Sequence, residues 1–294
     1  MPAKAKRASS AGHAGKAGHA GHAGHAGRAG TAGHAGHAGQ AGHAGHAPSA
    51  AWATAAAAII PAGGPTGDDI LDLALTHKGE KYVFGARAPM ANAAWKGPWD
   101  CAEFCSWCVF QVAGTLYGVR PSHDPVRADA FTGYWGEDAA ARGVAIAVED
   151  ALRTPGACLL RVPQSGRTGH IAFSDGKGGT MEAHSTARGV IAHTAQGRRW
   201  DMGVLIPGVR YFAEEDFVPL EPAPPVLRLT DPMMRGPRIK KAQEALAALG
   251  YSVGTVDGIF GSQTEAAVLE FQIDRDQVPD GEIGKDTAEL LGIA

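Results

Sequence analysis

Three cysteines lie within eight residues of one apolar segment, "GPWDCAEFCSWCVF" at 97–110. The C-x3-C-x2-C spacing of Cys101, Cys105 and Cys108 is compatible with an iron–sulfur cluster, a buried helix face, or one reactive thiol beside two packing residues. Radical enzymes that bind a cluster through this spacing need many repeated βα units after it. The segment that follows here is short and reads as strands without crossover helices, which argues against a cluster.

A helix over 100–113 explains the spacing better. Asp100 can cap its start, Glu103 can complete a capping box, and Gly114 can end it. The three cysteines then stand at i, i+4 and i+7 and share one helix face.

The three thiols differ in their expected chemistry. Cys105 and Cys108 are most simply small buried apolar residues. Cys101 falls in the first helical turn, where the helix dipole and free N–H groups should stabilise a thiolate and lower its pKa. We therefore expect one nucleophile and two packing residues.

A thiolate that attacks an amide needs an imidazole to carry the proton to the leaving group. Two alternating strands, "GHIAFSD" and "TMEAHS", flank the turn "GKGG" at 176–179. In an antiparallel hairpin about this turn, His170 and His184 are opposite each other on one face. A register error of one residue would separate them.

The hairpin therefore predicts that His170 and His184 supply a base and a group that orients it, in the manner of a catalytic triad. Zinc binding by Cys101, His170 and His184 is the alternative that this set of ligands leaves open. We expect surface or satisfied core positions for the remaining histidines outside the tail, which are His77, His123 and His193.

The charge of the chain is uneven. Its 294 residues carry a net charge of −3, yet residues 1–49 contain five Lys or Arg and no Asp or Glu. Nucleic-acid binders spread basic side chains over a folded surface, so we expect no nucleic-acid partner. The most apolar segment, residues 50–60, is shorter than the roughly 20 residues of a spanning helix, so we expect no membrane span.

Residues 1–49 form a low-complexity tail. From Ala11 to His46 the triplet Ala-Gly-X is repeated twelve times, with eight His at X. No large apolar side chain offsets the entropy of ordering such a segment, so we expect a disordered tail. Its imidazoles could bind metal ions or, when protonated, an anionic polymer; a solvated spacer is the alternative.

The rest of the chain predicts two folded domains. Helical patterns at 67–78 and 100–113 occur with short alternating strands, which is typical of an α+β fold. Five prolines in 219–232 predict a semi-rigid linker. The sequence thus predicts a disordered tail (1–49), a linker (50–66), an α+β domain (67–218), a proline-rich linker (219–232) and a small all-α domain (233–294).

The all-α domain contains an internal repeat. "VDGIFGSQTEAAV" at 256–268 is matched by "PDGEIGKDTAELL" at 279–291, with Asp-Gly at the start of each copy. After the first Asp-Gly turn, Ser262 and Glu265 fit a capping box for the next helix.

The segments "YVFGA", "WDCAEFCSW" and "GHIAF…MEAHS" resemble the NlpC/p60-type cell-wall cysteine peptidases, a family with a papain-like fold, over roughly residues 67–215. The resemblance implies that Cys101 is the nucleophile, His170 the general base and acid, and His184 the orienting residue. Tyr82 matches the tyrosine that lies beside the nucleophile in this family. The backbone N–H of Cys101 would then donate to the oxyanion.

Residues 233–294 resemble the small three-helix peptidoglycan-binding domain, through "IKKAQEALAALGY", "VDGIFGSQTEAAVLEFQ" and "DGEIGKDT". The resemblance implies peptidoglycan as the partner. We take Asp257, Gly258, Phe260 and Gly261 as candidate substrate-binding residues.

Together the two resemblances predict a peptidoglycan hydrolase that cleaves a stem-peptide amide bond without a cofactor or metal. The family favours the bond between D-Glu and the diamino acid; an N-acetylmuramoyl-L-alanine amidase and a non-catalytic wall-binding protein are the alternatives. We expect action at the bacterial cell wall or periplasm after export or injection without a standard signal peptide. A phage endolysin, a secreted toxin and a wall enzyme all fit this expectation.

Overall fold

The computed structural model describes residues 63–142, 144–164, 166–212 and 222–294; the predicted tail and most of the first predicted linker lie outside them. Among the described helices, none has the length and apolar character needed to span a bilayer. The elements are α2 (Gly67–Thr76), α3 (Cys101–Ala113), β1 (Val119–Arg120), β2 (Asp129–Ala130), α4 (Thr132–Arg142), β3 (Ala145–Ile146), α5 (Val148–Leu152), β4 (Cys158–Arg161), β5 (His170–Ser174), β6 (Gly179–Ser185), β7 (Gly189–Thr194), β8 (Met202–Val204), α6 (Pro237–Ala248), α7 (Ser262–Asp274) and α8 (Lys285–Leu290).

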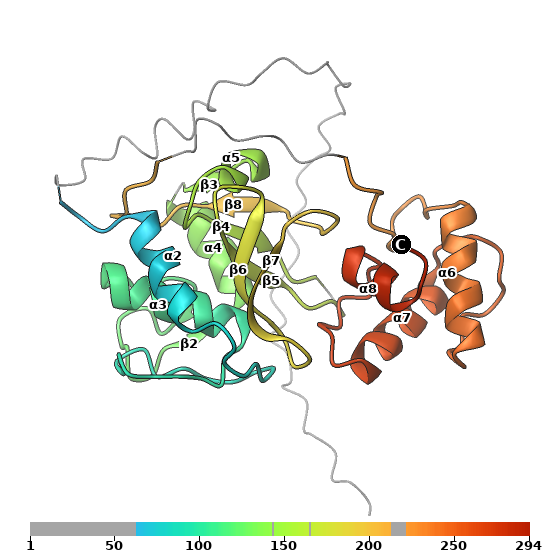
Figure 1. Cartoon of the computed structure of the whole chain (residues 1–294), viewed down its shortest axis with the longest axis horizontal. Coiled ribbons are helices and arrows are strands. Elements are labelled where there is room, and N and C mark those ends of the chain that lie inside the picture. The colour runs from blue at the N-terminus through green and yellow to red at the C-terminus, as the bar shows by residue number, and fades with distance from the viewer. Residues whose placement is uncertain (1–62, 143, 165, 213–221) are drawn as a thin grey trace, which may run out of the picture. The chain divides into compact units, whose positions relative to one another are not determined.

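Residues 63–212 form what we call the sheet domain. Its main sheet has six antiparallel strands in the order β3-β8-β4-β5-β6-β7, and β1 and β2 form a separate pair. Helices α2 and α3 pack on each other, and α3 packs on β5 and β6 (Figure 1). The α+β expectation is confirmed, because helices here cover an antiparallel sheet instead of connecting parallel strands.

Helix α3 begins and ends where the sequence predicts. The Asp100 side chain accepts the N–H of Glu103 at 2.8 Å, and Gly114 ends the helix with a φ of 64°. The predicted capping box is wrong, because the Glu103 carboxylate instead accepts the N–H groups of Ala88 and Ala130. The first nine residues of α3 are all buried, so the helix is enclosed by α2, the sheet and these loops and has no polar stripe.

The β5–β6 hairpin has the predicted register. Phe173 pairs with Met181 and Ser174 with Thr180, and this register, if continued along both strands, would pair position 170 with position 184. The ring centroids of His170 and His184 are 6.2 Å apart. Gly176 in the turn has a φ of 76°, a backbone conformation that residues other than glycine rarely adopt.

Residues 222–294 form what we call the C-terminal helical domain, with its own core around Leu246, Phe260 and Phe271. Its three helices, α6, α7 and α8, confirm the all-α expectation (Figure 1). Leu227, which lies in the predicted linker, belongs to this core and pairs through its backbone with Ile283.

The start of α7 differs from the prediction. Gly261 is its N-cap and no side chain caps the helix, so the predicted box of Ser262 and Glu265 is wrong. Glu265 instead forms an ion pair with Arg167 of the sheet domain at 2.6 Å. The Glu265 carboxylate, which the local pattern assigned to a helix cap, therefore binds Arg167, a residue distant in the sequence.

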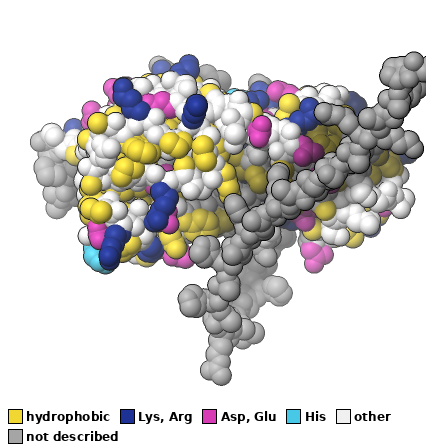
Figure 2. All heavy atoms as spheres, turned by 90° about the horizontal axis from the view of Figure 1, so that it is seen from below, with side chains coloured by type: hydrophobic (Ala, Val, Ile, Leu, Met, Phe, Trp, Pro, Cys, Tyr) yellow, Lys and Arg dark blue, Asp and Glu magenta, His cyan; other side chains and the backbone are white. Residues whose placement is uncertain are grey.

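The surface drawn in Figure 2 is mixed in charge. On this face Lys and Arg side chains lie scattered among Asp and Glu, with apolar side chains between them.

Candidate active site

Cys101 is the first residue of α3, and its side chain is 7 % exposed. The backbone N–H of Ile171, the residue after His170, is close enough to the sulfur to lower the pKa of the thiol, so Cys101 lies near the start of β5. Burial, together with the nearby Asp100 carboxylate, raises the pKa of Cys101 to about 12. The predicted lowering of this pKa is wrong for the structure as it stands, because loss of hydration outweighs the helix N-terminus.

Tyr82 lies beside this thiol. A backbone bridge pairs Tyr82 with Trp99, two residues before the cysteine, and the tyrosine side chain is buried. Burial raises the pKa of Tyr82, and the charge of a Cys101 thiolate would raise it further, which requires the two groups to be close. The structure thus places Tyr82 near Cys101.

His170 begins β5 and is almost fully buried. Its Nε2 lies 2.5 Å from the Glu182 carboxylate, and its Nδ1 is buried with no hydrogen-bond partner among the described residues. Burial lowers the pKa of His170 to about 4, so the ring is neutral near pH 7. A neutral ring that donates Nε2–H to a carboxylate carries its lone pair on Nδ1.

Glu182, on the neighbouring strand β6, is held by several groups at once. It accepts hydrogen bonds from Arg198 at 2.6 and 2.8 Å and from Thr180 at 2.5 Å. Burial alone would raise the pKa of Glu182, but the Arg198 charge and the His170 hydrogen bond bring it well below the usual value. The guanidinium of Arg198 in turn lies 4.7 Å from the ring centre of Trp200.

Glu182 is the site residue that the sequence interpretation missed. It stands two positions before His184 on β6, and its carboxylate reaches His170. The signal was present in "MEAHS", where a carboxylate accompanies the histidine that the hairpin register singled out.

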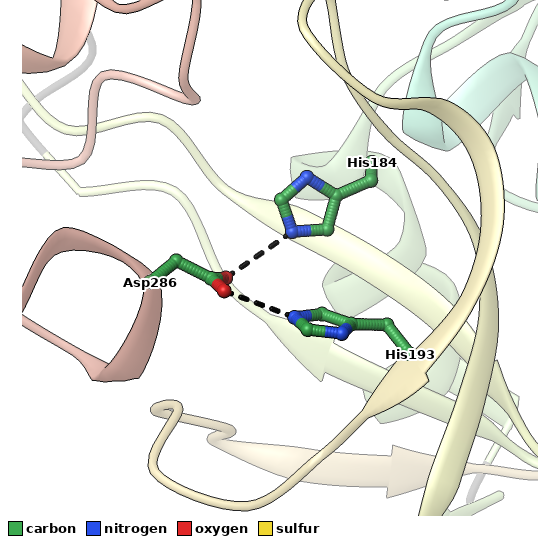
Figure 3. Close-up of side chains that lie close together, drawn as sticks. All are labelled: His184, His193 and Asp286. Carbon is green, nitrogen blue, oxygen red and sulfur yellow. Dashed lines mark hydrogen bonds and ion pairs between the residues drawn. The ribbon is translucent and has the colours of Figure 1, made fainter. Parts of the chain in front are cut away.

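His184 lies near His170 but has other hydrogen-bond partners. Its Nδ1 lies 3.0 Å from the Ser185 hydroxyl, and its Nε2 lies 3.3 Å from the Asp286 carboxylate. His193, expected only as a surface or core residue, lies 3.0 Å from the same carboxylate (Figure 3).

Within the described part of the chain, His184, His193 and Asp286 are the group whose ligand atoms lie close enough to share a metal ion. Neither a Cys101–His170–His184 group nor a set of cysteines meets this criterion there. Cys105 and Cys108 are fully buried, as expected of packing residues. His77 is also a buried core residue, with Nδ1 2.9 Å from Glu80.

The C-terminal helical domain covers this site. Arg161, opposite His170 on β4, forms an ion pair with Asp280 at 2.5 Å, and Arg199 pairs with Glu282 at 2.8 Å. The cavity left beside His170 has a volume of only about 50 Å³. In each pair the sheet domain supplies the cation and the C-terminal helical domain the carboxylate. We call this the closed arrangement.

The candidate polymer-binding residues lie on a different side of that domain's core. Asp257 and Gly258 line a concavity of about 330 Å³ together with basic side chains, Arg235 and Lys240. Gly261, the N-cap of α7, follows these residues in the chain.

Phe260 differs from its candidate neighbours. Its side chain is fully buried in the core and cannot contact a polymer. It therefore stabilises the turn that presents Asp257 and Gly258.

Comparison with known proteins supports the resemblance of the C-terminal helical domain. Residues 235–291 match the family model described as "Putative peptidoglycan binding domain". The crystal structure of the NlpC/p60 domain of the peptidoglycan hydrolase SagA is similar to 48 % of this chain and 99 % of that domain, at 23 % sequence identity and a TM-score of 0.35.

Proposed function

We propose that this protein is a peptidoglycan hydrolase whose nucleophile is Cys101. The observation that carries the proposal is the neutral, buried His170, with Nε2 held by Glu182 and an unpartnered Nδ1, next to a thiol at a helix N-terminus. A base with its lone pair kept free beside a nucleophile is the arrangement that acyl transfer needs. The match of residues 235–291 to a peptidoglycan-binding family supports the choice of polymer.

In the proposed reaction, Nδ1 of His170 takes the thiol proton of Cys101 as the thiolate attacks the amide carbonyl. The electron pair of the carbonyl moves to its oxygen, where the backbone N–H of Cys101 stabilises the negative charge. Collapse of this intermediate breaks the C–N bond, and Nδ1–H gives its proton to the leaving amine. Water, deprotonated by the same nitrogen, then hydrolyses the thioester and restores the thiol.

Glu182, and not His184, is the orienting residue in this proposal. Its carboxylate fixes the ring by accepting Nε2–H and stabilises the imidazolium that forms during the reaction. Arg198 keeps that carboxylate ionised despite its complete burial.

Catalysis requires the closed arrangement to open. A stem peptide cannot enter a cavity of about 50 Å³, and both Cys101 and His170 are buried.

The basic side chains around the site favour the bond between D-Glu and the diamino acid. D-Glu in the stem is linked through its γ-carboxyl and keeps a free α-carboxylate beside that bond. Arg161, which pairs with the Asp280 carboxylate in the closed arrangement, is placed to accept such a group. An amidase would cut next to L-Ala, which offers no carboxylate to this arginine.

The test is digestion of purified sacculi by wild type, Cys101→Ala and two matched variants of the same helix, Cys105→Ala and Cys108→Ala. We expect soluble fragments from all but the Cys101 variant, and mass spectrometry of the fragments identifies the bond cut. Equal release by wild type and Cys101→Ala would end the catalytic proposal and leave a wall-binding protein. Loss of activity in all three folded variants would favour a cluster or metal instead.

A further inference from the structure

We propose that His184, His193 and Asp286 form a binding site for a divalent transition-metal ion of the Zn²⁺ class. The two imidazoles come from neighbouring strands of the sheet domain, β6 and β7, and the carboxylate comes from α8 (Figure 3). This inference does not depend on the proposed hydrolysis.

The distances fit one metal ion. All three ligand atoms lie within 4.8 Å of one another, and Asp286 is 3.3 Å from Nε2 of His184 and 3.0 Å from Nε2 of His193. With bonds of about 2.0–2.1 Å, tetrahedral zinc separates its ligand atoms by roughly 3.4 Å. The side chains therefore need only small shifts to bind an ion between them.

The hydrogen bonds around His184 suit a metal ligand. Its Nδ1 lies 3.0 Å from the Ser185 hydroxyl, so Nδ1–H can donate there and leave the Nε2 lone pair directed at the shared point. A ligand histidine usually donates its other ring N–H to such a partner, which fixes the ring. Two imidazoles and one carboxylate are a donor set that zinc binds, with a fourth position open to water.

Arg188 is the cation next to two of these ligands in the structure. Its guanidinium lies 3.2 Å from His193 Nε2 and 3.2 Å from the Asp286 carboxylate. The side chain is 30 % exposed, so it can turn into solvent when an ion binds. The metal ion then replaces the Arg188 guanidinium as the positive charge beside the Asp286 carboxylate.

Because the ligands come from both domains, a bound ion would hold α8 against the sheet domain. Asp286 and His184 also line the small cavity beside His170, so metal binding would favour the closed arrangement. If the proposed function holds, Zn²⁺ should therefore slow the release of wall fragments.

The test is titration of the full-length protein with Co²⁺, followed by visible absorption, and then competition with Zn²⁺. Tetrahedral Co²⁺ absorbs strongly, whereas Co²⁺ that tail histidines bind together with water is octahedral and absorbs weakly. The variants are His193→Ala and Asp286→Asn, and His123→Ala is the matched control because it removes an exposed histidine outside the cluster.

We expect wild type and His123→Ala to show one saturable tetrahedral band. Loss of an outer-shell partner alone costs about 10–100-fold in metal affinity, so each ligand variant should lose at least about tenfold. Equal affinity in wild type and both ligand variants would overturn the site, and so would the lack of a tetrahedral band in wild type. The absorption does not depend on hydrolysis, so failure of the site and failure of the proposed function are separate results.

Discussion

The two copies of the Asp-Gly repeat in the C-terminal helical domain have the same scaffold and different surroundings. In the first loop, residues 256–261, the buried Gln243 of α6 donates to Asp257 and to the Thr264 hydroxyl. Its carbonyl oxygen accepts the N–H of Gly258 at 2.8 Å. One glutamine thus ties the turn to the start of the next helix.

The second loop, residues 279–284, repeats these bonds. The buried Gln272 of α7 donates to Asp280 at 2.7 Å and to the Thr287 hydroxyl, and it accepts the N–H of Gly281 at 2.9 Å. The repeat in the sequence is therefore a repeat of hydrogen bonds as well.

What differs is the surface that each aspartate meets. Asp257 is exposed and lines an open concavity, whereas Asp280 is ion-paired with Arg161 beside the candidate active site. The comparison teaches that this turn only presents a carboxylate. The neighbouring domain decides whether that carboxylate faces a ligand or closes a cavity.

The two loops should differ most in the effect of removing the aspartate charge from each of them. Asp280→Asn keeps an acceptor for Gln272 but leaves the Arg161 guanidinium, 9 % exposed, without its counter-charge. Breaking a buried ion pair in this way costs about 3–5 kcal/mol, so Asp280→Asn should destabilise the closed arrangement by about that much relative to the open one. Asp257→Asn removes an exposed charge and should cost less than about 0.5 kcal/mol. Hydrogen exchange of β4 and β5 amides measures the opening. Similar exchange in the two variants would show that Asp280 does not hold the cavity closed.

Acid should lower the free energy of unfolding of the sheet domain, because His170 is buried in its neutral form. His170 has a pKa near 4 because burial disfavours its charged form, whereas an unfolded histidine has a pKa of about 6.5. The unfolded state therefore binds more protons between these values, so this stability is present above pH 6.5 and is lost as pH falls towards 4. The loss is about 3 kcal/mol at pH 4. Urea unfolding between pH 7 and 4 measures it, and His170→Gln should flatten the dependence.

The shared scaffold predicts equal losses from Gln243→Leu and Gln272→Leu. Each glutamine is almost fully buried, and leucine of similar size would leave the glycine N–H of its turn without an acceptor. An unsatisfied buried donor costs about 1–3 kcal/mol, so we expect about 2 kcal/mol in each variant. Urea unfolding at neutral pH measures both. A loss in one variant alone would mean that only one loop depends on its glutamine.

Local patterns predicted the parts of the fold that neighbouring residues determine. The Asp100 cap, the end of α3 at Gly114 and the hairpin register follow from turn chemistry and from the period of two in strands. The repeat of the Asp-Gly turns was also visible in the sequence. Each of these features depends on residues close together in the chain.

The parts that could not be predicted depend on distant partners. Asp286 meets two histidines about a hundred positions earlier in the chain, and Glu265 is drawn from its expected cap by Arg167. The pKa of Cys101 depends on what covers it, which no local pattern states. The sequence interpretation missed Glu182 because the hairpin register singles out His184, the residue directly opposite His170. The Glu182 side chain reaches the His170 ring diagonally.

The smallest expected effect concerns wall binding by the two loops. Asp257→Ala should weaken binding to sacculi by about 1 kcal/mol, or roughly fivefold, because it removes an exposed polar group from the concavity. Asp280→Ala should leave binding unchanged, since its carboxylate faces Arg161. Sedimentation with sacculi, in a Cys101→Ala background that prevents digestion, measures both. Equal weakening would mean that the second loop also contacts the polymer, so the closed arrangement must open before the wall is bound and not after.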